Sequence, residues 1–171
     1  MAPTIDELIR LAKGAGKILK DGFGKQHEIK MKGVIDLVTE IDKQSEDYLV
    51  KRIHNMHPSD MITGEESGIH HSGKSDNQWL VDPLDGTLNY SHGVPIFSVS
   101  IAYAQDGVVE LGVVFDPMQD ECFSAVRGKG AFLNEQRLKV SSINEMVSAM
   151  VCTGFPYDVH TVEENNLNYF S

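Results

Sequence analysis

Apolar residues recur at helical spacing near the start of the chain. Thr4 followed three residues later by Glu7 has the form of a capping box, in which two side chains satisfy free N–H groups at a helix start. The apolar positions then repeat every three or four residues up to Gly22 and Gly24: Leu8, Ile9, Leu11, Ala12, Ala15, Ile18 and Leu19. This pattern predicts an amphipathic helix that ends at the glycines.

A second helix is predicted from about Thr39 to Met56. The Thr39 hydroxyl is suited to cap its first turn, and Pro58 ends it because the residue before a proline disfavours helical backbone angles. Asp42 then lies in the first turn, where a carboxylate suits the positive end of the helix dipole. Asp42 is therefore open to a structural as well as a functional interpretation.

Short apolar runs separated by turn residues fill the middle of the chain. Residues 79–81 predict a buried strand that ends in a turn at 82–87. Further strands are predicted over residues 97–104, 108–115 and 121–126 and around Phe132. Because these strands are too close together for crossover helices, they predict an antiparallel meander. The expected class is α+β, a layered sandwich with helices packed on a largely antiparallel sheet.

The last part of the chain begins a new pattern. Residues 146–153 predict another strand, and residues 162–170 predict the start of a helix. We therefore expect an amino-terminal α+β domain over residues 1–144. Residues 145–171 are expected to begin a second α/β domain that is incomplete at this length.

Composition narrows the possible partners. The 171 residues include 25 acidic and 15 basic side chains, a formal charge of −10, and no basic run that would bind nucleic acid or an anionic membrane. The most apolar stretch, residues 94–104, is much shorter than the roughly twenty residues of a membrane span. Cys122 and Cys152 lack the spacing of a zinc site or a disulfide framework. These features favour a cytoplasmic protein.

Candidate chemistry is concentrated at one turn. Asp82 and Asp85 flank Pro83, which fixes φ and helps to aim the two carboxylates at one point. Gly86 and Thr87 follow, and free N–H groups at a helix start form an anion site. Carboxylates beside an anion site repel the anion unless cations lie between them. Mg²⁺ fits this arrangement, because it binds carboxylates and phosphate oxygens together.

Two more carboxylates lie upstream. Glu65 and Glu66 follow the apolar pair Met61-Ile62 at an expected strand end, so one of them would complete the acidic cluster. By themselves they are also compatible with a solvated loop. The two aspartates around a proline are likewise compatible with an ordinary turn that is closed by side-chain hydrogen bonds.

These residues are similar to signature segments of the inositol monophosphatase family. The segments are Glu65-Glu66-Ser67 and residues 79–90, which read WLVDPLDGTLNY and occur in the family's order and near its usual separation. Further similarity lies at residues 36–39 with Asp42, at 128–134 and at 153–156. The resemblance covers essentially the whole chain.

The resemblance implies a role for each matching residue. Metal ligands would be Glu65, Asp82, Asp85 and the main-chain carbonyl of Leu84. Residues that face the substrate would be Glu65, Leu84, Asp85, Gly86 and Thr87. Asp42 and Thr87 would orient or activate a water molecule, with Glu66 in a supporting catalytic role.

The implied reaction is hydrolysis of a small phosphate monoester by metal-activated water, without a phosphoenzyme. Two or three Mg²⁺ ions, or Mn²⁺ in their place, would balance three carboxylates and a phosphate. The resemblance also implies lithium sensitivity and a homodimer. The substrate stays open among inositol phosphates, fructose bisphosphate, histidinol phosphate and nucleotide 3′-phosphates.

Family members continue for roughly another domain, which would supply a further aspartate ligand and most contacts to the substrate's ring. A 171-residue product is therefore expected to be weakly active or inactive. One alternative is a haloacid-dehalogenase-type phosphatase, but its chemistry needs aspartates two apart, and Asp82 and Asp85 are three apart. The other alternative is a non-catalytic interaction module on the same scaffold.

Overall fold

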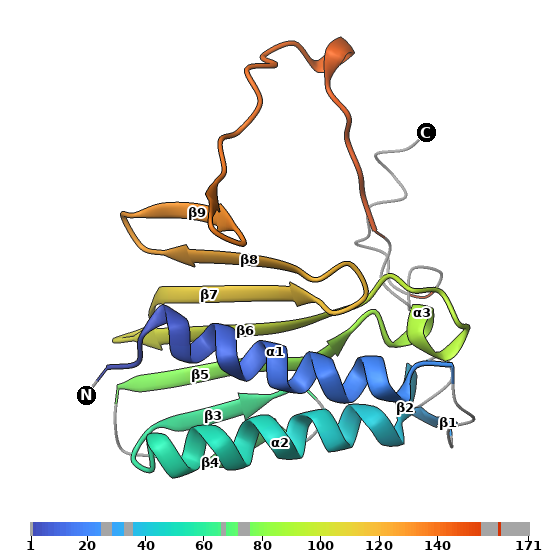
Figure 1. The fold of residues 1–171 in the computed structure, drawn as a ribbon, viewed down its shortest axis with the longest axis vertical. Coiled ribbons are helices and arrows are strands. Elements are labelled where there is room, and N and C mark those ends of the chain that lie inside the picture. Colours follow the sequence, from blue (N-terminus) through green and yellow to red (C-terminus); the bar gives the residue numbers. More distant parts are fainter. Residues whose placement is uncertain are drawn as a thin grey trace.

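Two layers make up most of the structure. The computed structural model describes residues 2–24, 29–32, 36–65, 68–71, 76–154 and 161. Helices α1 (Ile5–Gly22) and α2 (Glu40–Met56) lie side by side on one face of a large sheet (Figure 1). A separate hairpin of β1 (Ile29–Lys32) and β2 (Asp36–Thr39) precedes α2. The first two predicted helices and the predicted layered α+β class are thus confirmed.

The large sheet has eight strands, in the order β10-β9-β8-β7-β6-β5-β3-β4. Their bounds are β3 (Met61–Gly64), β4 (Gly68–His71), β5 (Asn77–Asp85), β6 (Ser98–Gln105), β7 (Val108–Asp116), β8 (Glu121–Val126), β9 (Gly130–Leu133) and β10 (Gln136–Arg137). Neighbouring strands are antiparallel except β3 and β5, which run parallel. The predicted antiparallel meander is confirmed, and the parallel pair brings the carboxyl ends of β3 and β5 to one edge.

Helix α1 forms as its sequence pattern indicates. The Thr4 hydroxyl accepts a hydrogen bond from the Glu7 N–H at 3.3 Å, and the Glu7 carboxylate accepts one from the Thr4 N–H at 2.6 Å. Its apolar stripe is buried over β6 and β7 and consists of Leu8, Leu11, Ala12, Ala15 and Leu19. Burial of this stripe, more than helix propensity, holds the helix in place.

Two glycines of α1 differ in what lies beside them. A Cβ atom at Gly16 would lie 2.6 Å from the ring of Phe115, which is buried on β7. A Cβ atom at Gly14 would instead meet the hydroxyl end of Tyr48, a half-buried side chain on α2 that can rotate away. Gly16 therefore sets how closely the helix approaches the sheet.

We expect Gly16→Ala to lower the free energy of unfolding by about 1–3 kcal/mol, the usual effect of overpacking a core. The loss should occur although alanine is the better helix former by about 1 kcal/mol. Gly14→Ala is the matched control in the same helix and should change stability much less. Urea unfolding followed by circular dichroism measures both variants, and equal losses would contradict the assigned role of Gly16.

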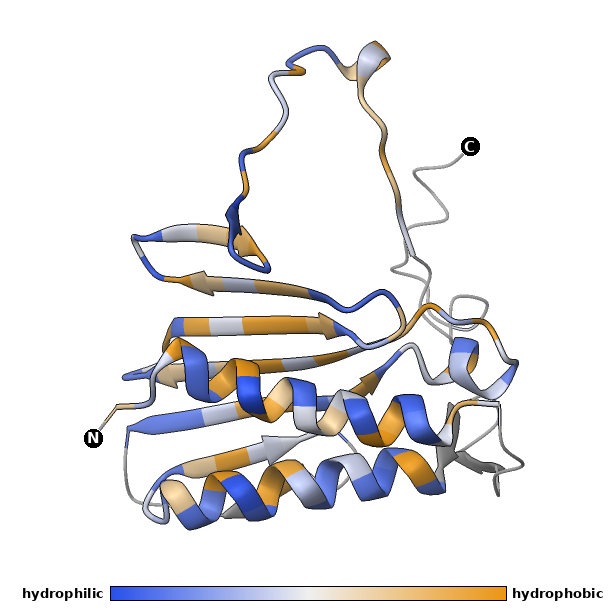
Figure 2. Ribbon diagram, in the orientation of Figure 1, coloured by the Kyte–Doolittle hydropathy of each residue, from blue (hydrophilic) through white to orange (hydrophobic). Residues whose placement is uncertain are grey.

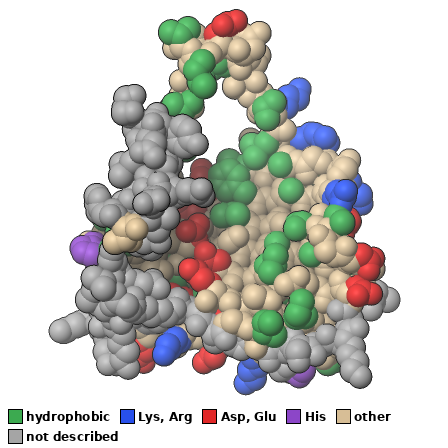
Figure 3. Space-filling model, turned by 180° about the vertical axis from the view of Figure 1, so that it is seen from behind, with side chains coloured by type: hydrophobic (Ala, Val, Ile, Leu, Met, Phe, Trp, Pro, Cys, Tyr) green, Lys and Arg blue, Asp and Glu red, His purple; other side chains and the backbone are tan. Residues whose placement is uncertain are grey.

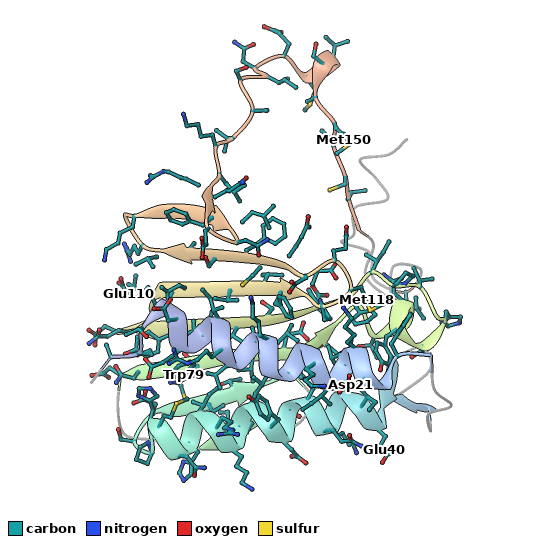
Figure 4. The ribbon with its side chains drawn as sticks, in the orientation of Figure 1. Asp21, Glu40, Trp79, Glu110, Met118 and Met150 are labelled. Atoms are coloured by element: carbon teal, nitrogen blue, oxygen red, sulfur yellow. The ribbon has the colours of Figure 1, made fainter. Side chains whose placement is uncertain are left out.

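Aromatic rings fill the layer between helices and sheet. Trp79 is fully buried beneath the helices and packs edge-on against Tyr103 at 5.4 Å between ring centroids (Figure 4). At the other end, Phe23 and Phe97 pack against Tyr90, with ring centroids 5.4 and 4.8 Å from it. Burial raises the pKa of Tyr90 to about 12. This second cluster links the end of α1 to the segment that follows β5.

Beyond β10 the chain leaves the sheet. Residues 138–154 form an irregular arch away from the sheet, with one 3-10 turn, η1 (Met146–Ser148) (Figure 1). The strand predicted over residues 146–153 is not formed, because a strand needs a neighbour for its N–H and C=O groups and no described strand lies beside this segment. Val140, Val147 and Met150 are 95–98% exposed there. Figure 2 shows hydrophobic residues interspersed with hydrophilic ones along this segment. The helix predicted over residues 162–170 lies outside the described residues.

The face of the sheet away from α1 and α2 carries apolar side chains. Leu80, Val114 and Phe123 are 38–39% exposed on it. Val114 and Phe123 line a groove of about 310 Å³ over β6, β7 and β8, and Figure 3 shows apolar side chains on this face. The helices of the described ranges are all too short or too polar to cross a bilayer. Exposed apolar side chains of the described residues are thus found on this sheet face and on residues 138–154, among other places.

Candidate functional site

Strand β5 contains a bulge between its two aspartates. Asp82 pairs with Ser100 of β6 and Asp85 pairs with Ser98, so three steps along β5 oppose two along β6. Residues three apart in a regular strand face opposite sides of the sheet, and one extra residue lets both aspartates face one side. The prediction that the strand ends at Val81 is wrong, because ladder pairing with β6 resumes at Asp85.

Side chains supply hydrogen bonds inside the bulge. The Leu84 N–H donates to Asp82 Oδ1 at 3.1 Å, and the Leu84 carbonyl accepts from Thr87 Oγ1 at 2.9 Å. The Pro83 carbonyl accepts from Ser45 Oγ of α2 at 3.0 Å, and Pro83 has no N–H to satisfy. The bulge is therefore held by groups before it, after it and on α2.

Gly86 turns the chain from the bulge into the short helix α3 (Thr87–Ser91). Its φ is 97°, a left-handed conformation that favours glycine, and a Cβ atom would lie 3.1 Å from the Ile96 carbonyl. The Tyr90 hydroxyl donates to the Leu19 carbonyl of α1 at 2.9 Å. The turn after the aspartates is thus anchored to the end of α1.

Glu65 reaches the same edge because β3 runs parallel to β5. The pair Gly64 and Val81 ends the β3–β5 ladder, and the Glu65 N–H donates to the Val81 carbonyl at 3.2 Å. Glu65 therefore directly follows β3 at the level of Asp82. The expected convergence of an upstream glutamate with the aspartates follows from this parallel register.

The acidic cluster changes the protonation of Asp82. Its pKa is raised from 3.8 to about 7, mainly because burial disfavours the charged form. The Glu65 carboxylate adds to this through its charge and through a hydrogen bond with Asp82, and the charge of Asp85 adds further. The Leu84 N–H acts in the opposite direction. The three carboxylates are thus close enough for their charges to interact.

Asp42, Glu66 and Thr87 are the predicted residues that remain to be placed. Asp42 is in the first turn of α2, as predicted, and is only 2% exposed. Ser98 Oγ donates to Asp85 Oδ2 at 3.4 Å. Glu66 lies outside the described residues, so its supporting role stays a prediction. The pairing of Asp42 with Thr87 also stays a prediction.

The possible metal ligands at the ends of β3 and β5 are hard oxygens: the carboxylates of Glu65, Asp82 and Asp85 and the carbonyl of Leu84. The Leu84 carbonyl accepts a hydrogen bond from Thr87 with one lone pair and keeps a second one for a cation. Such donors suit Mg²⁺, and a cluster of like charges favours a bound cation or a shared proton. Within the described ranges, no three acidic, histidine or cysteine side chains are arranged to enclose an ion. The donor chemistry fits the cation, and the ligand assignment stays a prediction.

Ser45 and Ser98 are the residues that sequence reasoning missed. A serine on the buried face of α2, three positions after Asp42, is a polar residue where the pattern favours an apolar one, and this was the available signal. Ser98 gave no comparable signal, because it lies inside the strand predicted over residues 97–104. Both contacts depend on elements that are distant in sequence.

Curated relatives cover almost all of this chain. The protein named Nus factor SuhB from Pasteurella multocida is 42% identical over 159 residues, which are 92% of this chain and 60% of that protein. Inositol monophosphatase 2 from Solanum lycopersicum is 42% identical over 157 residues, 90% of this chain and 59% of that protein. The chain therefore spans about three fifths of the length of these relatives.

The fold has the same relatives. The structure of inositol monophosphatase from Anabaena (Nostoc) sp. PCC 7120 superposes with a TM-score of 0.81 at 35% identity, over 94% of this chain and 58% of that one. The family model described as the inositol monophosphatase family matches residues 1–170. With the bulged aspartate pair and the glutamate beside it in place, the chain belongs to the inositol monophosphatase family.

Proposed function

We propose that this chain carries the metal-binding part of a Mg²⁺-dependent phosphomonoesterase that hydrolyses a small monoester such as an inositol monophosphate. The observation that supports it is that Glu65 and Asp85 both act on Asp82, where a bulge turns Asp82 and Asp85 to one side of β5. Carboxylates that lie close together repel one another, which raises the free energy of the folded chain. A cation that bridges them to a phosphate would neutralise this repulsion.

Each residue then has a defined task. Glu65, Asp82, Asp85 and the Leu84 carbonyl would hold the cations. Bound Mg²⁺ would lower the pKa of a coordinated water and neutralise charge on the phosphate and the leaving group. The N–H groups at Gly86 and Thr87, where α3 begins, would orient the phosphate. Asp42 and Thr87, with Glu66, would position the attacking water.

Calorimetric titration tests the metal site directly. We expect Mg²⁺ and Mn²⁺ to bind the parent chain and Asp82→Asn to weaken Mg²⁺ binding by more than about 100-fold, beyond the 10–100-fold typical of outer partners of a metal. Asp106→Asn is the matched control, because Asp106 lies in the β6–β7 turn at a φ of 52°, which asparagine tolerates well. The absence of Mg²⁺ binding by the parent would refute the site.

Phosphate release from a panel of monoesters, inositol monophosphate first, then tests the reaction. Because the chain spans about three fifths of its relatives, we expect low turnover that needs Mg²⁺ and is lost in Asp82→Asn. An aspartyl-phosphate trapped on Asp82 would favour the haloacid-dehalogenase alternative instead. The calorimetric titration also gives the number of Mg²⁺ ions bound per chain, which we expect to be two or three.

A binding role is the second candidate. The observation that favours it is the relative named Nus factor SuhB, at 42% identity. In that case the chain would bind another protein, and the acidic cluster would not need to bind a metal. A parent chain that is folded but binds neither Mg²⁺ nor Mn²⁺ would favour this candidate over the phosphatase.

A further inference from the structure

Ser45 makes an unusual contact for a serine inside a helix. It is fully buried on α2, and its hydroxyl donates to the Pro83 carbonyl at 3.0 Å. A serine in a helix commonly directs its hydroxyl to solvent or to a carbonyl one turn earlier. Here the partner is 38 residues away and belongs to the sheet. The bond therefore links two layers of the fold.

The linked carbonyl lies in the middle of the bulge. Pro83 stands between the two pairs that β5 forms around the irregularity, at Asp82 and Asp85, and is itself absent from the β5–β6 register. A buried carbonyl that has left its ladder needs another donor, because an unsatisfied one is costly. Ser45 supplies that donor, and so fixes the bulge to α2.

The same helix carries Asp42 one turn before Ser45. Residues three apart on a helix share a face, and both are buried, at 2% and 0% exposure. The bond from Ser45 to Pro83 therefore ties the helix turn that carries Asp42 to the bulge that carries Asp82. Mg²⁺ requires a nearly ideal octahedral arrangement of ligands, so small displacements of its ligands weaken Mg²⁺ binding.

We propose that Ser45 is a positioning residue for the cation site, which holds the Asp82–Asp85 bulge against α2 in the geometry that Mg²⁺ requires. The inference rests on the proposed function, because it assumes that the carboxylates bind Mg²⁺. Asp82 and Thr87 also hydrogen bond within the bulge, but both are assigned to the site itself. Ser45 can be changed without removing an assigned ligand.

Calorimetric Mg²⁺ titration of Ser45→Ala tests the proposal. We expect its affinity for Mg²⁺ to be about 10–100-fold weaker than that of the parent, the effect typical of groups that orient metal ligands. Ser45→Thr keeps the hydroxyl and should restore most of the affinity. Ser124→Ala is the matched control, because Ser124 is also buried, at 8% exposure, but lies on β8. It should bind Mg²⁺ like the parent.

Thermal unfolding without Mg²⁺ separates positioning from folding. If Ser45→Ala unfolds cooperatively and binds Mg²⁺ as tightly as the parent, the proposal is overturned and the proposed function stands. If the parent itself binds no Mg²⁺, both fail together. If Ser45→Ala does not fold, Ser45→Cys takes its place, because a thiol is a weaker donor of similar size. Parent-like Mg²⁺ affinity in Ser45→Cys then overturns the proposal.

Discussion

Without divalent cations, we expect the free energy of unfolding to be higher at pH 5 than at pH 8. Asp82 should contribute about 2 kcal/mol to this difference, a value already reduced because its side chain is partly exposed. The pKa of Asp82 is raised from 3.8 to about 7 by burial and by Glu65 and Asp85. An acid with a raised pKa in the folded chain stabilises the fold fully below its unfolded pKa. That contribution is lost as the pH rises through about 7. Urea unfolding at several pH values measures it.

Asp82→Asn isolates this effect from the seven histidines, which also titrate in the range. The variant should be nearly as stable at pH 8 as at pH 5 once the histidine contribution, common to both proteins, is subtracted. Mg²⁺ added at pH 8 should raise the stability of the parent and leave the variant unchanged, because the cation replaces the proton in the cluster. A parent and a variant with the same pH profile would contradict the assigned pKa.

Asp60→Ala should lower the free energy of unfolding by about 3 kcal/mol or more, because it removes a buried acceptor. Asp60 is 3% exposed and accepts from Trp79 Nε1 and from Asn77 Nδ2, each at 3.1 Å. Its loss leaves the fully buried indole N–H without this acceptor. Trp79 is the single tryptophan, so its fluorescence follows the unfolding transition directly.

Asp76→Ala is the matched control for Asp60, because Asp76 is exposed and directly precedes β5. It should change stability by less than about 0.5 kcal/mol, the usual range for exposed positions. Asp60→Asn keeps one acceptor oxygen and should fall between the two alanine variants. A loss in Asp60→Ala no larger than that in Asp76→Ala would show that the indole finds another partner.

The helices and the meander could be predicted because their signals are local. The pair Thr4 and Glu7 caps α1 as its sequence indicates, and Gly107 closes the β6–β7 turn at a φ of 75°. Residues 146–153 show the limit of such signals. Their apolar pattern suits a strand, but a strand forms only where a neighbouring strand supplies hydrogen bonds. Among the described residues, no strand pairs with this segment.

By itself, the sequence determined which residue types stand at the site: acidic side chains on both sides of Pro83, a glycine after Asp85, and Glu65 upstream. The tertiary structure decided how they meet. The parallel register of β3 with β5 brings Glu65 to Asp82, and the extra residue in β5 turns Asp82 and Asp85 to one side. The physical reason is that strand register and bulges are set by pairing between distant segments, which no local pattern encodes.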